Sequence, residues 1–320
     1  MNYKHFTIEE REMIFKYRTL NLSLTEIANK IKRNKSSISR ELKRNCITGE
    51  YSPSKAQENY KLNKQKCGRK NKLLMNTVLK AAVLQSLIDD WSPEQIHGRF
   101  KIEGRFRISF KTIYRAIADG ILNISAKQVL RRKGKSKKHG TAETRGKIKN
   151  RKMIIDRPLE ANNRLTVGHF ESDTVIGGGK KGAIATYVDR KSRFLIAGIM
   201  PNRKAVTFNE KTIDIFKDIP SSAIKTFTSD NGKEFSKFED LEKALEVTAY
   251  FANPYHSWER GTNENTNGLL RQYFPKKYDF SLISEDILQE AVNKINSRPR
   301  KVLGYLTASE VFWTEINGCT

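Results

Sequence analysis

The chain has 320 residues, a net charge of +25 and three scattered cysteines. The length allows two or three domains. Cys46, Cys67 and Cys319 have neither a zinc-site spacing nor the even number of a disulfide framework, which is typical of a reducing cytosol. The first residues contain no apolar segment of a signal peptide, and no apolar run approaches the length that spans a bilayer, so we expect neither secretion nor a membrane span.

The positive charge is concentrated in the N-terminal half of the chain. Residues 1–160 hold 38 Lys and Arg against 15 Asp and Glu, a net charge of +23, whereas residues 161–320 hold 22 against 20, a net charge of +2. A basic half joined to a nearly neutral half favours a polyanion-binding region attached to a part with another role. A membrane surface is the alternative partner, but no basic amphipathic helix with a Trp or Phe face is obvious, so nucleic acid is favoured.

Residues 1–48 are predicted to form three short helices. Capping boxes at Thr7–Glu10 and Ser23–Glu26 begin the first two, and Asn34 can cap a third over 35–44. Two short helices joined by a tight turn form a helix-turn-helix, although Lys32 stands in the turn where Gly is usual. A purely structural three-helix bundle is the alternative. The exposed side of the third helix is expected to contact bases and phosphates in a major groove through Lys35, Ser36, Ser37, Ser39, Arg40 and Lys43.

A second helical region is predicted over residues 73–126, after an extended, Lys-rich and partly helical connector at 49–72. Helices are expected over 71–89, from Ser92 onward and over 110–119, where Ser92 and Ser109 are suitable N-caps. The last two helices resemble a second helix-turn-helix, although their connection is long. Its exposed candidates for DNA contact are Lys111, Thr112 and Arg115.

Residues 127–160 are predicted to be a flexible basic linker. Lys127 to Lys152 contains twelve Lys or Arg and one acid, Glu143, with few apolar residues. Such a segment cannot bury a core. It is either a solvated tether or a segment that follows a phosphate backbone, with Arg131, Arg132 and Lys133 as candidate contacts.

Residues 161–320 have the pattern of an α/β domain followed by C-terminal helices. Three strands in meander order are followed by alternating helices and strands, which predicts a layered α/β architecture. The strands are expected at 169–176, 183–188, 194–200, 224–228 and 247–251, and the helices at 205–216, 235–245 and after Tyr255.

Three acidic residues fall where such an architecture forms sites. Asp173 is on the first strand, Asp230 ends the fourth, and Glu264 is on the helix after the fifth. Converging carboxylates would bind Mg²⁺ or Mn²⁺, and two ions would activate an attacking oxygen and stabilise a leaving oxygen in phosphoryl transfer. Glu171 shares the strand face with Asp173 and is a rival or supporting group. The alternatives are a plain turn around Asp230 and a solvated helix face around Glu264.

The helix that carries Glu264 has other candidates for phosphate contact. At helical spacing, Arg260, Glu264, Asn267 and Arg271 fall on one face. One carboxylate flanked by amides and arginines makes a poor core and a plausible reactive surface. We therefore predict contacts from Arg260, Asn263, Asn267 and Arg271 to phosphates near Glu264.

Five segments of the chain form recognisable motifs: Ser36–Asn45, Gly168–Asp173, Thr228–Phe235, Trp258–Arg271 and Asn296–Tyr305. The segment around Glu264 is the most specific of them, and 33 residues separate Asp230 from Glu264. Together the motifs resemble the bacterial insertion-sequence transposases of the IS-thirty family, and the resemblance covers almost the whole chain. Phe170 and Ser172 stand where the family usually has Trp and Gly, and these departures leave the three carboxylates unchanged.

The resemblance implies a ribonuclease-H-like, retroviral-integrase-like catalytic domain behind an all-α helix-turn-helix region. Its DDE triad would be Asp173, Asp230 and Glu264, holding two Mg²⁺ or Mn²⁺ ions. It implies binding of terminal inverted repeats, cleavage at the element ends and transfer of the 3′ hydroxyl to target DNA, without a covalent protein–DNA intermediate. It also implies a homodimer or higher oligomer in the bacterial cytoplasm, at the nucleoid. A DNA-binding regulator without catalysis and a nuclease without strand transfer are the alternatives.

Overall fold

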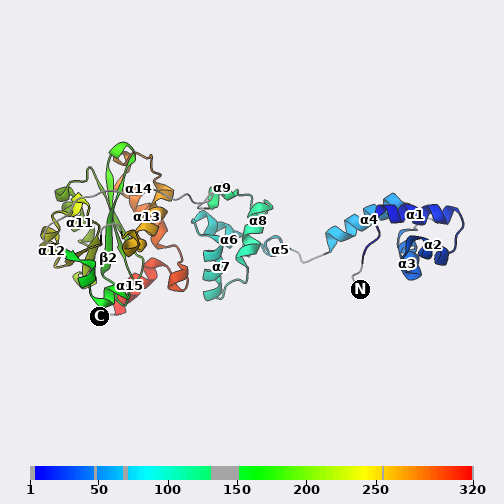
Figure 1. Ribbon diagram of the computed structural model, residues 1–320, viewed down its shortest axis with the longest axis horizontal. Helices are drawn as coiled ribbons and strands as arrows, with labels where there is room; N and C mark the ends of the chain where they lie inside the picture. The colour runs from blue at the N-terminus through cyan, green and yellow to red at the C-terminus, as the bar shows by residue number, and fades with distance from the viewer. Residues whose placement is uncertain (1–3, 47–48, 68–70, 131–150, 254–255, 319–320) are drawn as a thin grey trace. The chain divides into compact units, whose positions relative to one another are not determined.

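The computed structural model describes residues 4–46, 49–67, 71–130, 151–253 and 256–318. The chain divides into two compact units, Met1–Asn71 and Lys72–Thr320, and each has its own buried apolar clusters (Figure 1). Within the described residues, no helix is both long and apolar enough to cross a lipid bilayer.

The first unit is a four-helix structure whose first three helices begin where the capping motifs predicted. Thr7 and Glu10 form one capping box, Ser23 and Glu26 form another, and the Asn34 side chain accepts a hydrogen bond from the Ser36 N–H. Burial of Ile14, Ile27, Ile38 and Leu42 forms the centre of the core. The helices are α1 (Ile8–Thr19), α2 (Leu24–Ile31), α3 (Lys35–Asn45) and α4 (Pro53–Lys66).

The turn between α2 and α3 has the left-handed backbone that glycine usually supplies. Lys32 has φ 54° and ψ 42°, and its N–H bonds to the carbonyls of Ala28 and Asn29. A side chain is tolerated there at a cost, because L-residues disfavour this conformation. The turn is nevertheless tight, so the predicted helix-turn-helix forms without its glycine.

Helix α4 corrects the expectation of an extended connector at 49–72. Ser52 caps this helix of 14 residues, and Pro53 occupies its first turn. Ala56 and the preceding Tyr51 are buried in the core of the first unit. The segment is helical because its few apolar side chains are covered by α1 and α3, a tertiary effect that its Lys-rich composition concealed.

The second unit begins with five helices around their own apolar cluster, which includes Val83, Ile96, Phe100 and Ile113. The capping box of Ser92 and Gln95 is present, as predicted. Seven residues separate the two helices of the helix-turn-helix-like pair, α7 and α8. The helices are α5 (Lys72–Met75), α6 (Thr77–Ile88), α7 (Pro93–Ile102), α8 (Phe110–Ala118) and α9 (Ala126–Val129).

The predicted basic linker is only partly within the described residues. Its central part, with Arg131, Arg132 and Lys133, lies outside them. Its end is folded, which corrects the expectation of flexibility there: β1 (Lys152–Met153) pairs in parallel with residues 250–251. A 3₁₀ turn, η1 (Ile154–Asp156), and a short helix, α10 (Leu159–Asn162), lead into the sheet.

The rest of the second unit is built on a six-stranded mixed sheet with the order β1-β6-β5-β2-β3-β4. β3 is antiparallel to both neighbours, whereas β5 is parallel to β2 and β6 is parallel to β5. This is the strand order of a ribonuclease-H-like domain, and it places β2 at the centre. The five predicted strands are present as β2 (His169–Ile176), β3 (Ala183–Asp189), β4 (Leu195–Met200), β5 (Thr226–Ser229) and β6 (Thr248–Phe251).

Helices cover both faces of this sheet (Figure 1). On one face lie α11 (Ala205–Phe216) and α12 (Phe238–Leu245), over a cluster that includes Tyr187 and Phe227. On the other lie α13 (Gly261–Tyr273) and α14 (Glu285–Asn296), over a cluster that includes Ile184 and Val188. Alternate residues of β3 thus belong to opposite cores, as the period of a strand requires. The remaining elements are α15 (Ala308–Gly318), η2 (Gly178–Lys180), η3 (Ser221–Ala223), η4 (Lys233–Phe235), η5 (Ser257–Arg260), η6 (Phe280–Leu282) and η7 (Lys301–Leu303).

Candidate active site

Two of the predicted carboxylates meet at the centre of the sheet. Glu171 of β2 pairs with Thr228 of the parallel strand β5, so Asp173 and Asp230, each two residues further on, lie side by side. Asp173 Oδ1 accepts from the N–H of Thr174 at 2.9 Å, and Asp230 Oδ1 accepts from the N–H of Gly232 at 2.8 Å. Asp173 and Asp230 are called the carboxylate pair below.

Burial and neighbouring charges change the pKa of Asp173 in the carboxylate pair. Removal from water raises the pKa of Asp173, because the ionised form loses solvation. The cation of Arg260 opposes this rise in the pKa, and the neighbouring charge of Asp230 adds to it. The pair is therefore an electrostatically costly arrangement that needs a positive counter-charge.

Arg260 supplies a positive charge between the two carboxylates. Its Nη2 lies 3.1 Å from Asp230 Oδ2, and its Nη1 lies 3.7 Å from Asp173 Oδ1. Nη1 also donates to the carbonyl oxygen of Ser172 at 3.0 Å. The sequence predicted a phosphate contact for this residue, whereas the structure places it on the carboxylate pair.

The other polar residues predicted on α13 hold this helix against β2. Asn267 Nδ2 donates to Asp173 Oδ2 at 2.9 Å, and Arg271 Nη2 donates to the carbonyl oxygen of Ile176 at 2.7 Å. Asn263 is 1% exposed, and its side chain donates to the carbonyl oxygen of Glu171 at 3.2 Å. Their present contacts are within the protein, and their predicted contacts to DNA stay predictions.

Glu264 does not join the carboxylate pair. Its side chain is exposed, although Arg260 and Asn267, about one turn before and after it, both approach Asp173. In the part of the chain that the structure describes, no three His, Cys, Asp or Glu side chains are close enough together to hold a metal ion. In this arrangement Arg260, at the N-cap of α13, and Asn267 take the positions next to Asp173, and the convergence of three carboxylates stays a prediction.

Both carboxylate oxygens of Glu171 are held by contacts within the protein. Its side chain is fully buried, and its Oε1 accepts from Arg190 Nη1 at 2.5 Å. Its Oε2 accepts from the backbone N–H of Asn263 at 2.9 Å, in the first turn of α13. Glu171 therefore ties the strand that carries Asp173 to the helix that carries Glu264.

Glu234 is a further carboxylate beside the site, and it was not among the residues predicted from the sequence. Thr174 Oγ1 donates to its Oε1 at 2.7 Å, and Arg203 forms an ion pair with it. Burial alone would raise the pKa of Glu234, but the bonds from Thr174 and Arg203 outweigh burial and lower it. A Cβ on Gly232 would lie 2.6 Å from Glu234 Oε2, so a larger residue there would require the Glu234 carboxylate to move. The sequence feature that could have identified Glu234 is its position four residues after Asp230.

The carboxylate pair has the donor set of a site for a hard divalent cation. Mg²⁺ is usually held by one or two carboxylates together with substrate phosphates. Asp173 and Asp230 offer carboxylate oxygens to one point, and a cation, the guanidinium of Arg260, already lies there. The two residues therefore fit one ion without Glu264.

Glu259, in η5, contacts the chain before α13 instead of the carboxylate pair. Its carboxylate accepts from the N–H of Asn253 at 2.8 Å and from the Asn253 side chain at 2.9 Å. His256 Nδ1 lies 3.2 Å from the same carboxylate. These contacts organise the chain that enters α13.

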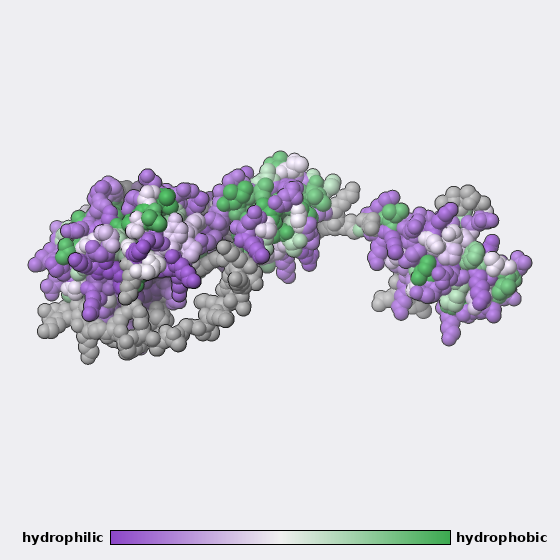
Figure 2. All heavy atoms as spheres, turned by 90° about the horizontal axis from the view of Figure 1, so that it is seen from above, coloured by the Kyte–Doolittle hydropathy of each residue, from purple (hydrophilic) through white to green (hydrophobic). Residues whose placement is uncertain are grey.

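The predicted DNA-reading face of α3 is largely exposed. Ser37 is half-buried, and Lys35, Ser36, Ser39, Arg40 and Lys43 are exposed. In the face of the first unit seen in Figure 2, hydrophilic residues predominate and hydrophobic ones are scattered. Of the candidates on α8, Lys111 and Arg115 are exposed and Thr112 is half-buried. The placement is compatible with contact to a polyanion in both helices.

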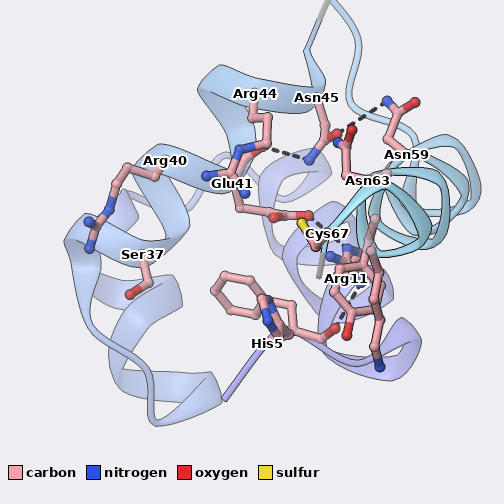
Figure 3. Close-up of a pocket in the computed structure, with 14 residues that line it drawn as sticks. His5, Arg11, Ser37, Arg40, Glu41, Arg44, Asn45, Asn59, Asn63 and Cys67 are labelled. Atoms are coloured by element: carbon pink, nitrogen blue, oxygen red, sulfur yellow. Dashed lines mark hydrogen bonds and ion pairs between the residues drawn. The ribbon is translucent and has the colours of Figure 1, made fainter. Parts of the chain in front are cut away.

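A pocket of about 310 Å³ lies between α3, α4 and the chain before α1. Figure 3 shows Arg44 and Asn45 of α3 across from Asn59 and Asn63 of α4, above the buried ion pair of Arg11 and Glu41. Arg11 Nε and Glu41 Oε1 are 2.7 Å apart, so they satisfy each other and leave the outer cations to face solvent. The outer cations are Arg40, Arg44 and Lys64.

Part of each unit matches a known domain family. A helix-turn-helix domain matches residues 2–45, and an integrase core domain matches residues 163–257. The fold and site thus define a DNA-binding protein with an integrase-type catalytic core.

Relatives that align with almost the whole chain identify the family within this class. The chain is 39% identical to the transposase of insertion sequence element IS4351 from Bacteroides fragilis, over 98% of this chain and 97% of that protein. It is 35% identical to transposase InsI of IS30A from Escherichia coli K12, over 96% and 83% of the two chains. It is 33% identical to the transposase of IS1086 from Cupriavidus metallidurans, over 97% and 94%. The chain belongs to this family of insertion-sequence transposases, and the relatives give no support to a regulator without catalysis.

Proposed function

We propose that the protein binds the terminal inverted repeats of an insertion sequence, cleaves a DNA strand at each end and joins the 3′ hydroxyl to target DNA. The observation that carries the proposal is the carboxylate pair on the two central parallel strands, with Glu264 one helical turn beyond Arg260. A carboxylate on the central strand β2 beside one that follows the end of β5 is suited to binding the metal ions of phosphoryl transfer. We assign Asp173, Asp230 and Glu264 as the catalytic triad.

Each residue has a distinct task in this reaction. Asp173 and Asp230 would hold Mg²⁺ or Mn²⁺, with Glu264 completing the site for two ions. Bound ions activate the attacking oxygen and stabilise the leaving oxygen of a phosphodiester. Arg271 lies on the same side of α13 and would bind a phosphate flanking the reacting one, since guanidinium groups match phosphate oxygens in charge and geometry.

The remaining parts of the chain would place the DNA. Helix α3 would read the repeat through its exposed hydroxyls and cations, and α8 would contact a second segment. Because two ends must be brought together, the working form would be a dimer or higher oligomer, in the bacterial cytoplasm at the nucleoid. The basic residues around Arg131 would follow the phosphate backbone between these contacts.

Cleavage and joining of repeat DNA test the proposal. Purified protein is incubated with labelled repeat DNA, a target duplex and Mg²⁺. We expect nicking at the repeat end followed by joined strands, and loss of both with Glu264→Gln. Glu239→Gln removes an exposed acid on α12, on the opposite face of the sheet, and is the matched control that keeps both products.

The pattern of products separates the alternatives. Specific binding without any nicking would rule out the transposase reaction. Nicking that never yields joined strands would favour a nuclease. Activity that survives Glu264→Gln would rule out Glu264 as the third catalytic acid.

A further inference from the structure

Arg260 is held inside the site rather than at its rim. Its side chain is 14% exposed and lies against both members of the carboxylate pair. The hydrogen bond from Nη1 to the carbonyl oxygen of Ser172, at 3.0 Å, fixes the direction of the guanidinium. The cation therefore occupies the point at which oxygens of Asp173 and Asp230 face each other.

The same contacts determine which residues of α13 face β2. Asn267, two turns after Arg260, donates to Asp173 Oδ2 at 2.9 Å. Glu264 lies between Arg260 and Asn267 in the sequence, but its side chain is exposed. While Arg260 and Asn267 contact Asp173, the side chain of Glu264 stays exposed and does not join the carboxylate pair.

A divalent ion shared by the carboxylate pair would need the oxygens that Arg260 contacts. Mg²⁺ or Mn²⁺ held by this pair would take carboxylate oxygens as direct ligands, at about 2 Å for Mg²⁺. Asp230 Oδ2 and Asp173 Oδ1 both face the guanidinium. A guanidinium and a divalent cation at one point repel each other, so both cannot occupy it.

We propose that Arg260 and a divalent ion are alternative counter-charges for the carboxylate pair, and that Arg260 leaves the pair before Glu264 becomes the third ligand. The proposal rests on the transposase function above. Exchanging Arg260 for one divalent ion together with Glu264 leaves the net charge of the site unchanged. A DNA phosphate that accepts the guanidinium then favours metal binding, and by linkage the metal favours DNA binding to the same extent.

Mn²⁺ affinity of the full-length protein tests the exchange without relying on activity. Free Mn²⁺ is followed by electron paramagnetic resonance, in the absence of DNA. We expect Arg260→Gln to bind Mn²⁺ about tenfold more tightly than the wild type, a typical size for coupling between two ligands. Adding Glu264→Gln to Arg260→Gln removes most of this gain, because the third ligand is lost. Arg260→Lys keeps the charge and gains less.

Arg193→Gln is the matched control. Arg193 Nη1 donates to Thr262 Oγ1 at 2.7 Å, so this change removes an arginine that contacts the first turn of α13 but does not contact the carboxylate pair. It leaves Mn²⁺ affinity at the wild-type value. A second measurement needs no variant: repeat DNA tightens Mn²⁺ binding to the wild-type protein.

Each outcome decides one of the two proposals. Unchanged or weaker Mn²⁺ binding by Arg260→Gln overturns the exchange, as does DNA that leaves wild-type Mn²⁺ affinity unaltered. Asp230→Asn separates this failure from failure of the proposed function. If Asp230→Asn abolishes Mn²⁺ binding but Arg260→Gln gains nothing, only the exchange is wrong. If Asp230→Asn leaves Mn²⁺ binding intact, the carboxylate pair is not the metal site and the proposed function loses its basis.

Discussion

At the scale of single residues, Glu171 is a buried carboxylate that supports the site through its contacts with Arg190 and Asn263. Glu171→Ala would leave Arg190 buried without its anionic partner and remove the acceptor for the Asn263 N–H. Breaking one side of a buried ion pair typically costs about 3–5 kcal/mol, so we expect a loss of that size in the free energy of unfolding. Urea denaturation without DNA or metal measures it.

The control for this prediction removes both charges. Glu171→Gln combined with Arg190→Met leaves no unpaired buried charge, so the double variant is expected to be more stable than Glu171→Ala. A loss below about 1 kcal/mol in Glu171→Ala would contradict the structural role. Strand alternation placed Glu171 on the face of Asp173, but its burial and its partner Arg190 depend on β3 and α13, which are distant in sequence.

His169 predicts a pH dependence of stability. Burial lowers the pKa of His169 from an ordinary value near 6.5 to about 4, despite the opposing charge of Glu160. Because the unfolded chain takes up the proton first, stability is complete above about pH 6.5 and falls as the pH drops towards 4, by up to about 3 kcal/mol. The difference in unfolding free energy between wild type and His169→Gln measures this effect across that window. A difference independent of pH would contradict it.

At the scale of elements, the turn of the first helix-turn-helix offers a stabilising change. Lys32 has a left-handed backbone, where glycine avoids a steric cost of about 1–2 kcal/mol. Lys32→Gly is therefore expected to raise the stability of the protein by about 1 kcal/mol, after the entropy of the unfolded glycine is subtracted. The midpoint of thermal unfolding of the first unit reports the change.

Lys30→Gly is the matched control within the same helix. Lys30 is exposed in α2, where glycine is expected to cost about 1 kcal/mol. Opposite signs at positions 30 and 32 would establish that backbone conformation, rather than loss of a lysine, causes the effect. Destabilisation at both positions would contradict the role given to the turn.

Elements defined by local signals were predictable from the sequence. The helices begun by Thr7, Ser23 and Ser92, and the strands on both sides of the buried β3, lie within a few residues of their expected places. Helix α4 and strand β1 were not predictable from the sequence. The core that α4 packs into and the strand that β1 pairs with are formed by residues elsewhere in the chain. Local capping and periodicity contain no information about such partners.

The arrangement of the site was likewise predictable only in part. The placement of Asp173 on the first strand and of Asp230 at the end of the fourth predicted that they would meet, because sites in α/β sheets form where strands end. Helical periodicity placed Arg260 and Glu264 on one side of α13, but it could not decide which of them would face the carboxylate pair. That choice depends on the hydrogen bonds of Arg260 to Ser172 and of Asn267 to Asp173, which are tertiary contacts.

At the scale of the whole molecule, the uneven charge predicts how binding to DNA depends on salt. Residues 1–160 hold nearly all of the net charge, and twelve Lys or Arg lie between Lys127 and Lys152. Each cation that neutralises a phosphate releases a counterion and contributes about 0.9 to the slope of log affinity against log salt concentration. A basic segment that follows the phosphate backbone therefore gives a steeper slope than one that only tethers two domains.

Replacing Arg131, Arg132 and Lys133 together by Ala is expected to reduce the magnitude of that slope by about 2–3. Fluorescence anisotropy with repeat DNA over a series of salt concentrations gives the slope. The matched control replaces Lys237, Lys243 and Lys301, three exposed lysines of the nearly neutral half, and is expected to change it little. An equal loss in both triple variants would mean that only total charge matters. An unchanged slope in the first would mean that the segment is a tether, leaving α3 and α8 to make the phosphate contacts.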